Sequence, residues 1–402
     1  MKVKNDLLKK ETRNIVLLGF VSFFADISSE MVYPLIPLYL TAVFGATPAL
    51  VGVIEGIAES IASLLKVFSG YISDRFQHKK AIAFSGYATG VIYKFALLFA
   101  GSWTGILLAR VIDRFGKGVR TAPRDVMVSE SADKNSMGKA FGIHKMLDMA
   151  GSAIGIILAC ILVKSIGENS YRIVFAVSII PVLLALCMFI FIKEKKIRRE
   201  TVQREHFWKN ISQLDGQLKL YLAVTFLFTL GNSSNSFLLL RATNVGFTSS
   251  DAILLYFVYN ITASILSVPC GKLSDRIGRK QLLVGGYSTF ALVYFGLAVC
   301  NNKILMVLIF VVYGAYTAMT AGVERAFIAE IAPAKLKGTM LGLHSTLAGI
   351  ALLPASVIAG LLWDSIGAYA PFMYGGIMAL ISAMILAKKL SYKPKSLMES
   401  KK

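Results

Sequence analysis

The sequence is poor in acidic residues and in charged residues as a whole. It holds 23 Asp and Glu against 43 Lys and Arg, and charged residues make up only 16% of the 402 positions. A soluble domain carries about a quarter. Several windows, among them 174–192 and 282–300, contain no charge and are long enough to cross a bilayer. Together with the 55% hydrophobic content, these windows predict a polytopic helical membrane protein.

Cysteine is scarce, and the sequence patterns of catalytic sites are missing. All four cysteines fall in predicted spans without metal-ligand spacing, which argues against a disulfide framework. The sequence contains no nucleophile–base pattern, metal-ligand cluster or phosphate-binding glycine loop. We therefore expect no enzyme activity, no metal and no cofactor. The missing Walker-type loop also removes ATP as an energy source within this chain.

The formal net charge of +20 is explained by its placement along the chain. Basic residues collect in every second loop between the apolar windows, which predicts that these loops and both termini face the cytoplasm. Residues 1–13 are charged and lack a small-residue cleavage site, so we read them as a cytoplasmic tail and not as a signal peptide. We expect a multi-pass protein of the inner (cytoplasmic) membrane and no nucleic-acid partner.

Counting apolar windows predicts twelve spans, an even number as the charge pattern requires. They cover approximately 15–41, 48–70, 81–101, 104–127, 139–164, 171–193, 218–240, 250–270, 281–300, 304–330, 338–362 and 371–389. The longest hydrophilic stretch, 194–217, is read as a cytoplasmic linker. It divides the chain into an N-terminal six-helix half, 1–193, and a C-terminal six-helix half, 218–402.

An internal repeat supports this division. GYISDR at 70–75 recurs as GKLSDR at 271–276, and GKAFGIHKML at 138–147 recurs as GTMLGLHSTL at 338–347. Because each half has six spans, both copies have the same orientation in the membrane. We therefore expect an all-α membrane protein in which two parallel six-helix halves surround a central cavity, an architecture found among secondary transporters.

The loops after the second and eighth spans resemble a known signature. Residues 271–280, GKLSDRIGRK, match in full the G-x-x-x-D-R-x-G-R-[RK] signature of the major facilitator superfamily, whereas the first copy has Gln77 and His78 where the family prefers Gly and Arg. SFFADISSEMVYPLIPL and DRFGKGVRTAPRD are similar to a prokaryotic subgroup of efflux-type permeases. The Gly-Pro pair usual in the fifth span of drug/proton antiporters is absent, because Gly151 is followed by serine. The resemblance implies transport by alternating access and leaves the substrate open.

The signature loops and the end of the fourth span are expected to act as a gate. An acidic residue beside a helix N-terminus gains favourable dipole and hydrogen-bond interactions. Arg75 is expected to pair with a carboxylate at the cytoplasmic end of the fourth span, for which Asp125 is the candidate. The predicted gating residues are Gly70, Asp74, Arg75, Arg124, Asp125, Gly271, Asp275 and Arg276.

The fourth span carries more cations than a lipid-facing helix tolerates. A Lys or Arg at a helix centre costs roughly 2.5–3.5 kcal/mol on bilayer insertion. At 100° per residue the charged residues fall within an arc of about 120° and form a stripe about 21 Å long. The stripe consists of Arg110, Asp113, Arg114, Lys117, Arg120 and Arg124. It is expected to face either a substrate cavity or carboxylates on other spans, and both alternatives stay open.

Polar residues in other spans extend the candidate cavity. Its predicted lining is Glu59, Arg110, Asp113, Arg114, Lys117, His144, Asn232, Asn235, Glu324 and Arg325. A structural salt-bridge lattice of Arg114 and Lys117 with Asp113 and Glu59 is the alternative to a binding role. His144 has an equivalent in the second repeat, His344, so a shared packing role competes there. Aromatic residues that can line a pathway or anchor at the interfaces include Tyr33, Tyr39, Tyr256, Tyr259, Phe237 and Trp363.

Proton coupling is predicted for Asp26, Glu30 and Asp148. A carboxylate in a low-dielectric span is costly to ionise, which suits a proton carrier. Asp26 and Glu30 lie four residues apart and share a helix face. Fixed pairing with Arg110 or Arg114 is the alternative role.

The residues together predict a proton-coupled secondary transporter that exports a small organic solute such as a drug, metabolite or siderophore, with anions among the candidates. Proton-coupled uptake of an anionic metabolite is the second hypothesis, and a membrane sensor or assembly factor is the third. The expected partners are the solute, protons and the lipid bilayer, and the expected state is a monomer. The sequence does not decide the solute, the direction of transport, or the coupling ion and its stoichiometry.

Overall fold

The computed structural model describes residues 2–76, 78–131, 137–167, 171–194, 215–331 and 337–390. Within the helices, the side chains of residues 2–12, 66–76 and 137–143 are among those left undescribed. Every regular element in the described part is an α-helix. The predicted linker lies almost wholly outside this part, so the predicted division of the chain at 194–217 stays a prediction.

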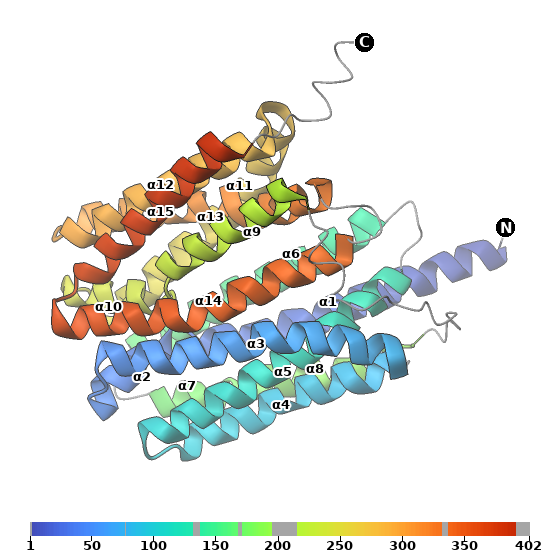
Figure 1. The fold of residues 1–402 in the computed structure, drawn as a ribbon. Coiled ribbons are helices and arrows are strands. Elements are labelled where there is room, and N and C mark those ends of the chain that lie inside the picture. Colours follow the sequence, from blue (N-terminus) through green and yellow to red (C-terminus); the bar gives the residue numbers. More distant parts are fainter. Residues whose placement is uncertain are drawn as a thin grey trace, which may run out of the picture. The chain divides into compact units, whose positions relative to one another are not determined.

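Fifteen helices make up the described part of the chain (Figure 1). They are α1 Lys2–Val32, α2 Leu35–Phe44, α3 Pro48–Phe76, α4 Lys79–Phe99, α5 Trp103–Glu130, α6 Met137–Ile166, α7 Tyr171–Val177, α8 Ile179–Ile190, α9 Gly216–Gly231, α10 Ser236–Asn244, α11 Ser249–Ile277, α12 Arg279–Val299, α13 Lys303–Ile331, α14 Lys337–Ser365 and α15 Ala370–Lys389. Three spans consist of two helices each, namely α1 with α2, α7 with α8, and α9 with α10. The fifteen helices therefore form the twelve predicted spans.

Eleven of these spans are recognisable by length and hydropathy among the described residues. The exception is α5, whose charged residues remove it from any apolar count although it is as long as its neighbours. The average hydropathy of α5 therefore does not explain how its cations are accommodated. The contacts that their side chains make must stabilise them.

The chain forms two compact units. Unit 1 comprises Met1–Ala46, Ile57–Arg199 and Thr248–Phe257, and unit 2 comprises Thr47–Gly56, Glu200–Phe247 and Val258–Lys402. The first turns of α3 therefore belong to unit 2, where a Cβ atom at Gly52 would collide with the backbone of Ser356 on α14. The first turns of α11 belong to unit 1, where the Cys160 thiol lies 3.6 Å from the carbonyl oxygen of Ser250.

The same packing scheme occurs in each unit. In unit 1, α1 packs against α6 and α8, and α4 packs against α5 and α8. In unit 2, α9 packs against α14 and α15, and α12 packs against α13 and α15. The pairs α4–α5 and α12–α15 run side by side in Figure 1. The sequence repeat thus corresponds to a repeated arrangement of helices.

Glycines allow the closest of these contacts. A Cβ atom at Gly151 of α6 would collide with the backbone of Phe23 on α1, and one at Gly155 would collide with the backbone of Ile27. The two glycines therefore allow close helix–helix approach, because only a missing side chain lets the backbones meet.

Two spans are interrupted near their polar residues. Pro34 separates α1 from α2, and since proline has no N–H, the carbonyl of Glu30 loses its usual helical donor there. In unit 2, residues 232–235 separate α9 from α10. Non-helical backbone at membrane depth is tolerated where it lies within protein or lines a cavity. We therefore expect each break to lie within the protein or beside a cavity.

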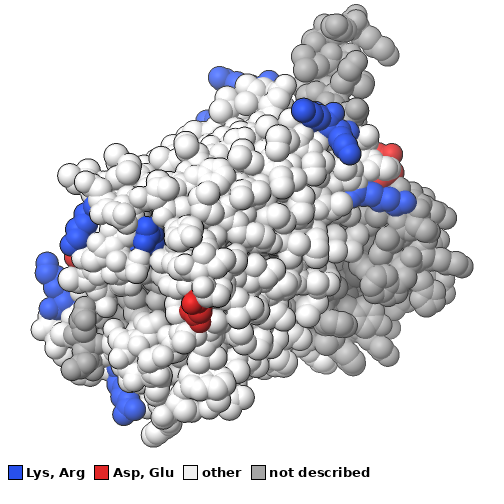
Figure 2. All heavy atoms as spheres, turned by 60° about the vertical axis from the view of Figure 1, so that its left-hand side comes forward, with Lys and Arg blue, Asp and Glu red and all other residues white. Residues whose placement is uncertain are grey.

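The exterior suits lipid. Large apolar side chains such as Phe99, Ile265 and Leu292 are more than half exposed. On the face in Figure 2 most of the described surface is uncharged, with scattered blue Lys and Arg side chains. The chain is a multi-pass membrane protein.

Candidate functional site

The cations of α5 are buried inside unit 1 and not turned to lipid. Arg110 is 1% exposed, Arg114 5% and Arg120 6%. A charge removed from water in this way is stable only if it is paired and hydrogen-bonded. The contacts of these side chains therefore decide what the stripe does.

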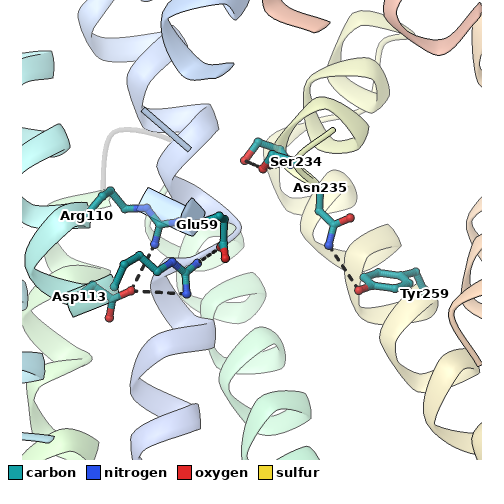
Figure 3. A network of polar contacts seen from close by, with 8 residues as sticks. Glu59, Arg110, Asp113, Ser234, Asn235 and Tyr259 are labelled. Atoms are coloured by element: carbon teal, nitrogen blue, oxygen red, sulfur yellow. Dashed lines mark hydrogen bonds and ion pairs between the residues drawn. The ribbon is translucent and has the colours of Figure 1, made fainter. Parts of the chain in front are cut away.

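Arg110 and Arg114 form an ion-pair cluster with two carboxylates (Figure 3). Arg114 Nη2 lies 2.6 Å from Glu59 Oε1 on α3, and its Nη1 lies 3.8 Å from Asp113 Oδ2. Arg110 Nη1 lies 3.4 Å from the same Asp113 oxygen. Two cations and two carboxylates balance one another in a salt-bridge lattice. It differs from the lattice considered from the sequence, because Arg110 and not Lys117 is the second cation.

An aromatic side chain covers the two guanidinium groups. The ring centre of Tyr33 lies 5.3 Å from Cζ of Arg110 and 5.5 Å from Cζ of Arg114, within the range of cation–π attraction. Tyr33 in turn packs against Tyr256 of α11, with ring centres 5.7 Å apart. Tyr33 lies at the break between α1 and α2, which lets its side chain reach α5.

A cavity of about 180 Å³ opens beside this cluster and lies wholly within unit 1. Its lining is Ser29, Glu30, Tyr33, Glu59, Tyr93, Arg110, Asp113, Arg114, Lys117 and Tyr256. Among the described residues, the Lys117 side chain makes no hydrogen bond or ion pair, although it lies close enough to Glu30 for electrostatic attraction. We call this space the unit 1 cavity. It holds five of the ten predicted lining residues together with Glu30.

Lys94 is a buried cation that the sequence reading missed. It is 1% exposed, and its Nζ donates a hydrogen bond of 2.9 Å to the carbonyl oxygen of Ser28 on α1. Arg110 and Asp113 are among its electrostatic neighbours. Its position inside an otherwise apolar window was the signal that could have revealed it.

The predicted proton carriers also meet in unit 1. Asp26 of α1 and Asp148 of α6 are electrostatic neighbours, and Lys117 and Arg120 are the nearby cations. Two carboxylates side by side repel one another, and a proton or a nearby cation relieves that repulsion. The predicted group of Asp26, Glu30 and Asp148 therefore occupies neighbouring positions, with Glu30 on the cavity wall.

The end of α5 nearer Glu130 makes separate contacts. Arg120 lies over the Tyr87 ring with its Cζ 4.6 Å from the ring centre. Arg124 pairs with the adjacent Asp125 at 2.9 Å and donates to Ser22 Oγ at 3.3 Å.

His144, which the sequence assigned to the cavity, lies beside this end of α5 and not on the lining of the unit 1 cavity. Its Nε2 is 2.9 Å from Ser22 Oγ. The contact joins α6 to α1, as a shared packing role would require.

The predicted gate is described only in part. The side chains of Gly70, Asp74 and Arg75 lie outside the described residues, so the predicted pairing of Arg75 with Asp125 stays a prediction.

In the second copy of the signature, Asp275 is 3.6 Å from Arg279, and Arg279 is 3.1 Å from Glu330 at the end of α13. Arg276 is exposed, and Gly271 is half-buried.

The first copy has an equivalent of that last contact. Lys79 Nζ lies 2.6 Å from Glu130 Oε1, and both side chains are less than a tenth exposed. The positions are 200 residues before Arg279 and Glu330. Both repeats thus lock the first residues of one helix to the last turn of the next by an ion pair.

Unit 2 presents hydroxyl and amide groups where unit 1 presents charges. Asn235 donates to Tyr259 at 3.4 Å and accepts from the Tyr313 hydroxyl at 2.8 Å, and Figure 3 includes the first of these bonds. Asn232 donates to the Tyr316 hydroxyl at 3.2 Å. The two asparagines that the sequence selected therefore belong to one tyrosine–amide network, which the α9–α10 break makes possible.

Glu324 and Arg325, also predicted for the cavity, differ in their surroundings. Glu324 Oε1 accepts a hydrogen bond of 3.0 Å from the Tyr287 hydroxyl, and Oε2 lies 3.8 Å from His344 Nε2. Arg325 is exposed.

A multi-pass helical protein with a repeated scaffold, interrupted spans and buried charges around a small cavity has the features of a secondary transporter. Comparison with known proteins agrees. The model of the Major Facilitator Superfamily matches residues 18–239 and again 220–401. The chain belongs to the Major Facilitator Superfamily.

Three relatives indicate the range of this likeness. An uncharacterised MFS-type transporter of Methanocaldococcus jannaschii is 35% identical, over 96% of this chain and 97% of its own. A gentisate transporter of Corynebacterium glutamicum is 24% identical over 92% and 86%. Multidrug resistance protein MdtG of Escherichia coli is 24% identical over 70% and 71%.

Solved structures share the fold at low identity. A nucleoside transporter superposes with a TM-score of 0.78 at 11% identity, covering 93% of this chain and 98% of its own. A D-xylose–proton symporter superposes with a TM-score of 0.74 at 17% identity, covering 94% and 97%. At this identity the likeness concerns the fold alone.

Proposed function

We propose that this secondary transporter carries a small organic anion together with protons. The observation on which the proposal rests is Lys117, which lines the unit 1 cavity while Arg110 and Arg114 are engaged with Asp113 and Glu59. A substrate carboxylate can bind Lys117 without breaking the lattice. Tyr33, beside it, offers an aromatic surface.

The size of the cavity supports a small metabolite over a drug. Pockets for drug-sized ligands enclose roughly 300–1,000 Å³, whereas the unit 1 cavity encloses about 180 Å³. A single-ring aromatic carboxylate is a solute of the right class. One relative is named for gentisate, an acid of this kind.

The arrangement of charges favours binding anion and proton together. Lys117 is the cation near both Glu30 and Asp26. An anion bound at Lys117 offsets its positive charge, and protonation of the neighbouring carboxyl groups then becomes more favourable. Linkage is reciprocal, so protonation in turn strengthens anion binding. Co-binding of this kind gives symport, and therefore uptake when the outside is more acidic.

Export in exchange for protons is the second candidate, which the sequence put first. The likeness to a protein named for multidrug resistance favours it. Exchange requires that solute and proton compete, so it fits a cationic or neutral solute better than an anion. We also propose, on the charge pattern of the loops, that both termini face the cytoplasm in the inner membrane. The proposed state is a monomer.

Transport of labelled gentisate by purified protein in liposomes tests the proposal. With the outside more acidic, we expect accumulation that falls at least tenfold in Lys117→Gln, because the substrate carboxylate loses its cation. Lys164→Gln, at an exposed lysine of α6, is the matched control and should transport normally. Glu30→Gln should transport without following the pH gradient.

The direction of the gradient separates the two candidates. Accumulation only when the lumen is more acidic would support export. If neither gradient drives gentisate, benzoate or muconate, the proposed substrate class is wrong.

A further inference from the structure

Helix α13 carries two carboxylates with different partners. Glu330 lies 3.1 Å from the guanidinium of Arg279. Glu324, a turn and a half earlier, forms no ion pair with a Lys or Arg side chain anywhere in the described chain, although its side chain is only 17% exposed. Glu324 is therefore a partly buried acid whose charge needs another form of compensation.

The groups around Glu324 come from three other helices. The Tyr287 hydroxyl of α12 donates to Oε1 at 3.0 Å, and His344 Nε2 of α14 lies 3.8 Å from Oε2. The Tyr221 ring of α9 lies parallel to the His344 ring, with ring centres 6.4 Å apart. On α13 itself Tyr316 and the exposed Arg325 are the electrostatic neighbours.

These surroundings suit a carboxyl group that gains and loses a proton. One neutral hydroxyl donor compensates a buried negative charge only partly, because an unpaired buried ion costs far more than a hydrogen bond returns. A proton on Glu324 removes the imbalance. Among the described residues His344 Nε2 makes no hydrogen bond, so a neutral imidazole can accept one from a protonated Glu324 carboxyl group.

The first repeat shows the contrasting case. His144 is the equivalent of His344, but the position of Glu324 is occupied by Arg124. There the histidine bonds to Ser22 at 2.9 Å and the arginine pairs with Asp125. The acid–imidazole pair is a feature of the second repeat and cannot be explained as a shared packing element.

We propose that Glu324 and His344 form a proton-binding site in unit 2, in addition to the carboxyl groups of unit 1. The site takes one proton from solvent and returns it to solvent, with Tyr287 as a neutral hydrogen-bond donor to the carboxyl group. The evidence for this site is its local geometry. Only its role in coupling proton movement to transport rests on the proposed function.

Infrared difference spectra between acidic and alkaline pH, recorded on the full chain in liposomes, test the site without a substrate. Protonated carboxyl groups absorb apart from carboxylates, and we expect Glu324→Gln to lose one such component. Glu330→Gln is the matched control, because the Glu330 carboxylate is held by Arg279, and it should keep every component. His344→Gln should retain the band and shift the pH at which it appears.

A second variant keeps the test decisive if Glu324→Gln does not fold. Tyr287→Phe removes the hydroxyl that bonds Glu324 and should shift the frequency of the same component. An unchanged band in both Glu324→Gln and Tyr287→Phe would overturn the inference. Asp26→Asn reports separately on the unit 1 carboxyl groups, and failure to transport gentisate would leave the Glu324 component in place, so the two proposals fail independently.

Discussion

Helices α5 and α13 occupy equivalent positions in the two repeats but differ in the polarity and charge of their side chains. Ion pairs at their last turns, Lys79–Glu130 and Arg279–Glu330, set the same register in both. In that register four charged residues of α5 are replaced in α13 by aromatic or hydroxyl residues: Arg110 by Phe310, Asp113 by Tyr313, Lys117 by Thr317 and Arg120 by Thr320. Arg114 is replaced by Gly314, and Arg124 by the acidic Glu324.

This difference distinguishes the residues that support the shared fold from the residues that give each unit its own polar chemistry. The positions that hold helices together keep similar residues in both repeats, such as Tyr87 and Tyr287. The positions that face polar groups differ, because nothing in the packing requires charge there. Unit 1 therefore depends on balanced ion pairs, whereas the network of unit 2 depends on neutral hydrogen bonds. Substitutions that break ion pairs and substitutions that break neutral hydrogen bonds should therefore reduce the stability of the protein by different amounts.

The largest effect is expected where a buried charge loses its partner. Arg114→Ala removes the buried guanidinium that Glu59 and Asp113 share. Glu59 is 29% exposed and can be hydrated, and Asp113 keeps its 3.4 Å contact with Arg110, so the cost should lie near the lower end of the about 3–5 kcal/mol for a buried pair broken from one side. Thermal melting of the purified protein in detergent should show a large loss of stability. The double variant with Glu59→Gln should recover part of it, since one uncompensated charge is removed. A loss no larger than that of a single hydrogen bond would contradict the lattice.

An intermediate effect is expected at the equivalent ion pairs. Lys79 and Glu130 are 7% and 4% exposed, against 25% and 21% for Arg279 and Glu330. Lys79→Gln should cost about 3 kcal/mol because Glu130 stays buried, whereas Arg279→Gln should cost about 1 kcal/mol because water can reach Glu330. Melting curves of the two variants side by side measure the difference. Equal losses would mean that solvent exposure does not distinguish the repeats.

The smallest effect is expected in the tyrosine–amide network. Tyr313→Phe removes the hydroxyl that donates to Asn235 at 2.8 Å, which should cost about 0.5–1.5 kcal/mol. The exposed Tyr369 is the matched control, and Tyr369→Phe should leave the melting temperature unchanged. A Tyr313→Phe loss as large as that of Arg114→Ala would remove the distinction between the two units.

Many residues of the site could be predicted from the sequence, but the ion pairs and hydrogen bonds between them could not. A helical projection of α5 placed the cations on one face, and spacing of four selected Asp26 and Glu30. Which contacts the stripe would make stayed open, because Glu59 and Asp148 lie on helices whose rotation the sequence does not specify. Lys94 was missed for a related reason, since only its contact with the α1 backbone separates it from an interfacial lysine.

The sequence by itself determined the twelve spans, the repeat and the family. Spanning a bilayer is a local requirement, for which about 20 apolar residues suffice, and the signature loop is contiguous. Only the tertiary structure decided that Arg110 and Arg114 are neutralised within a lattice while Lys117 lines the unit 1 cavity. Only the structure decided that Glu324 meets Tyr287 and His344 in place of a cation. Electrostatic pairing changes within a few ångströms, and such distances between helices exist only once the chain has folded.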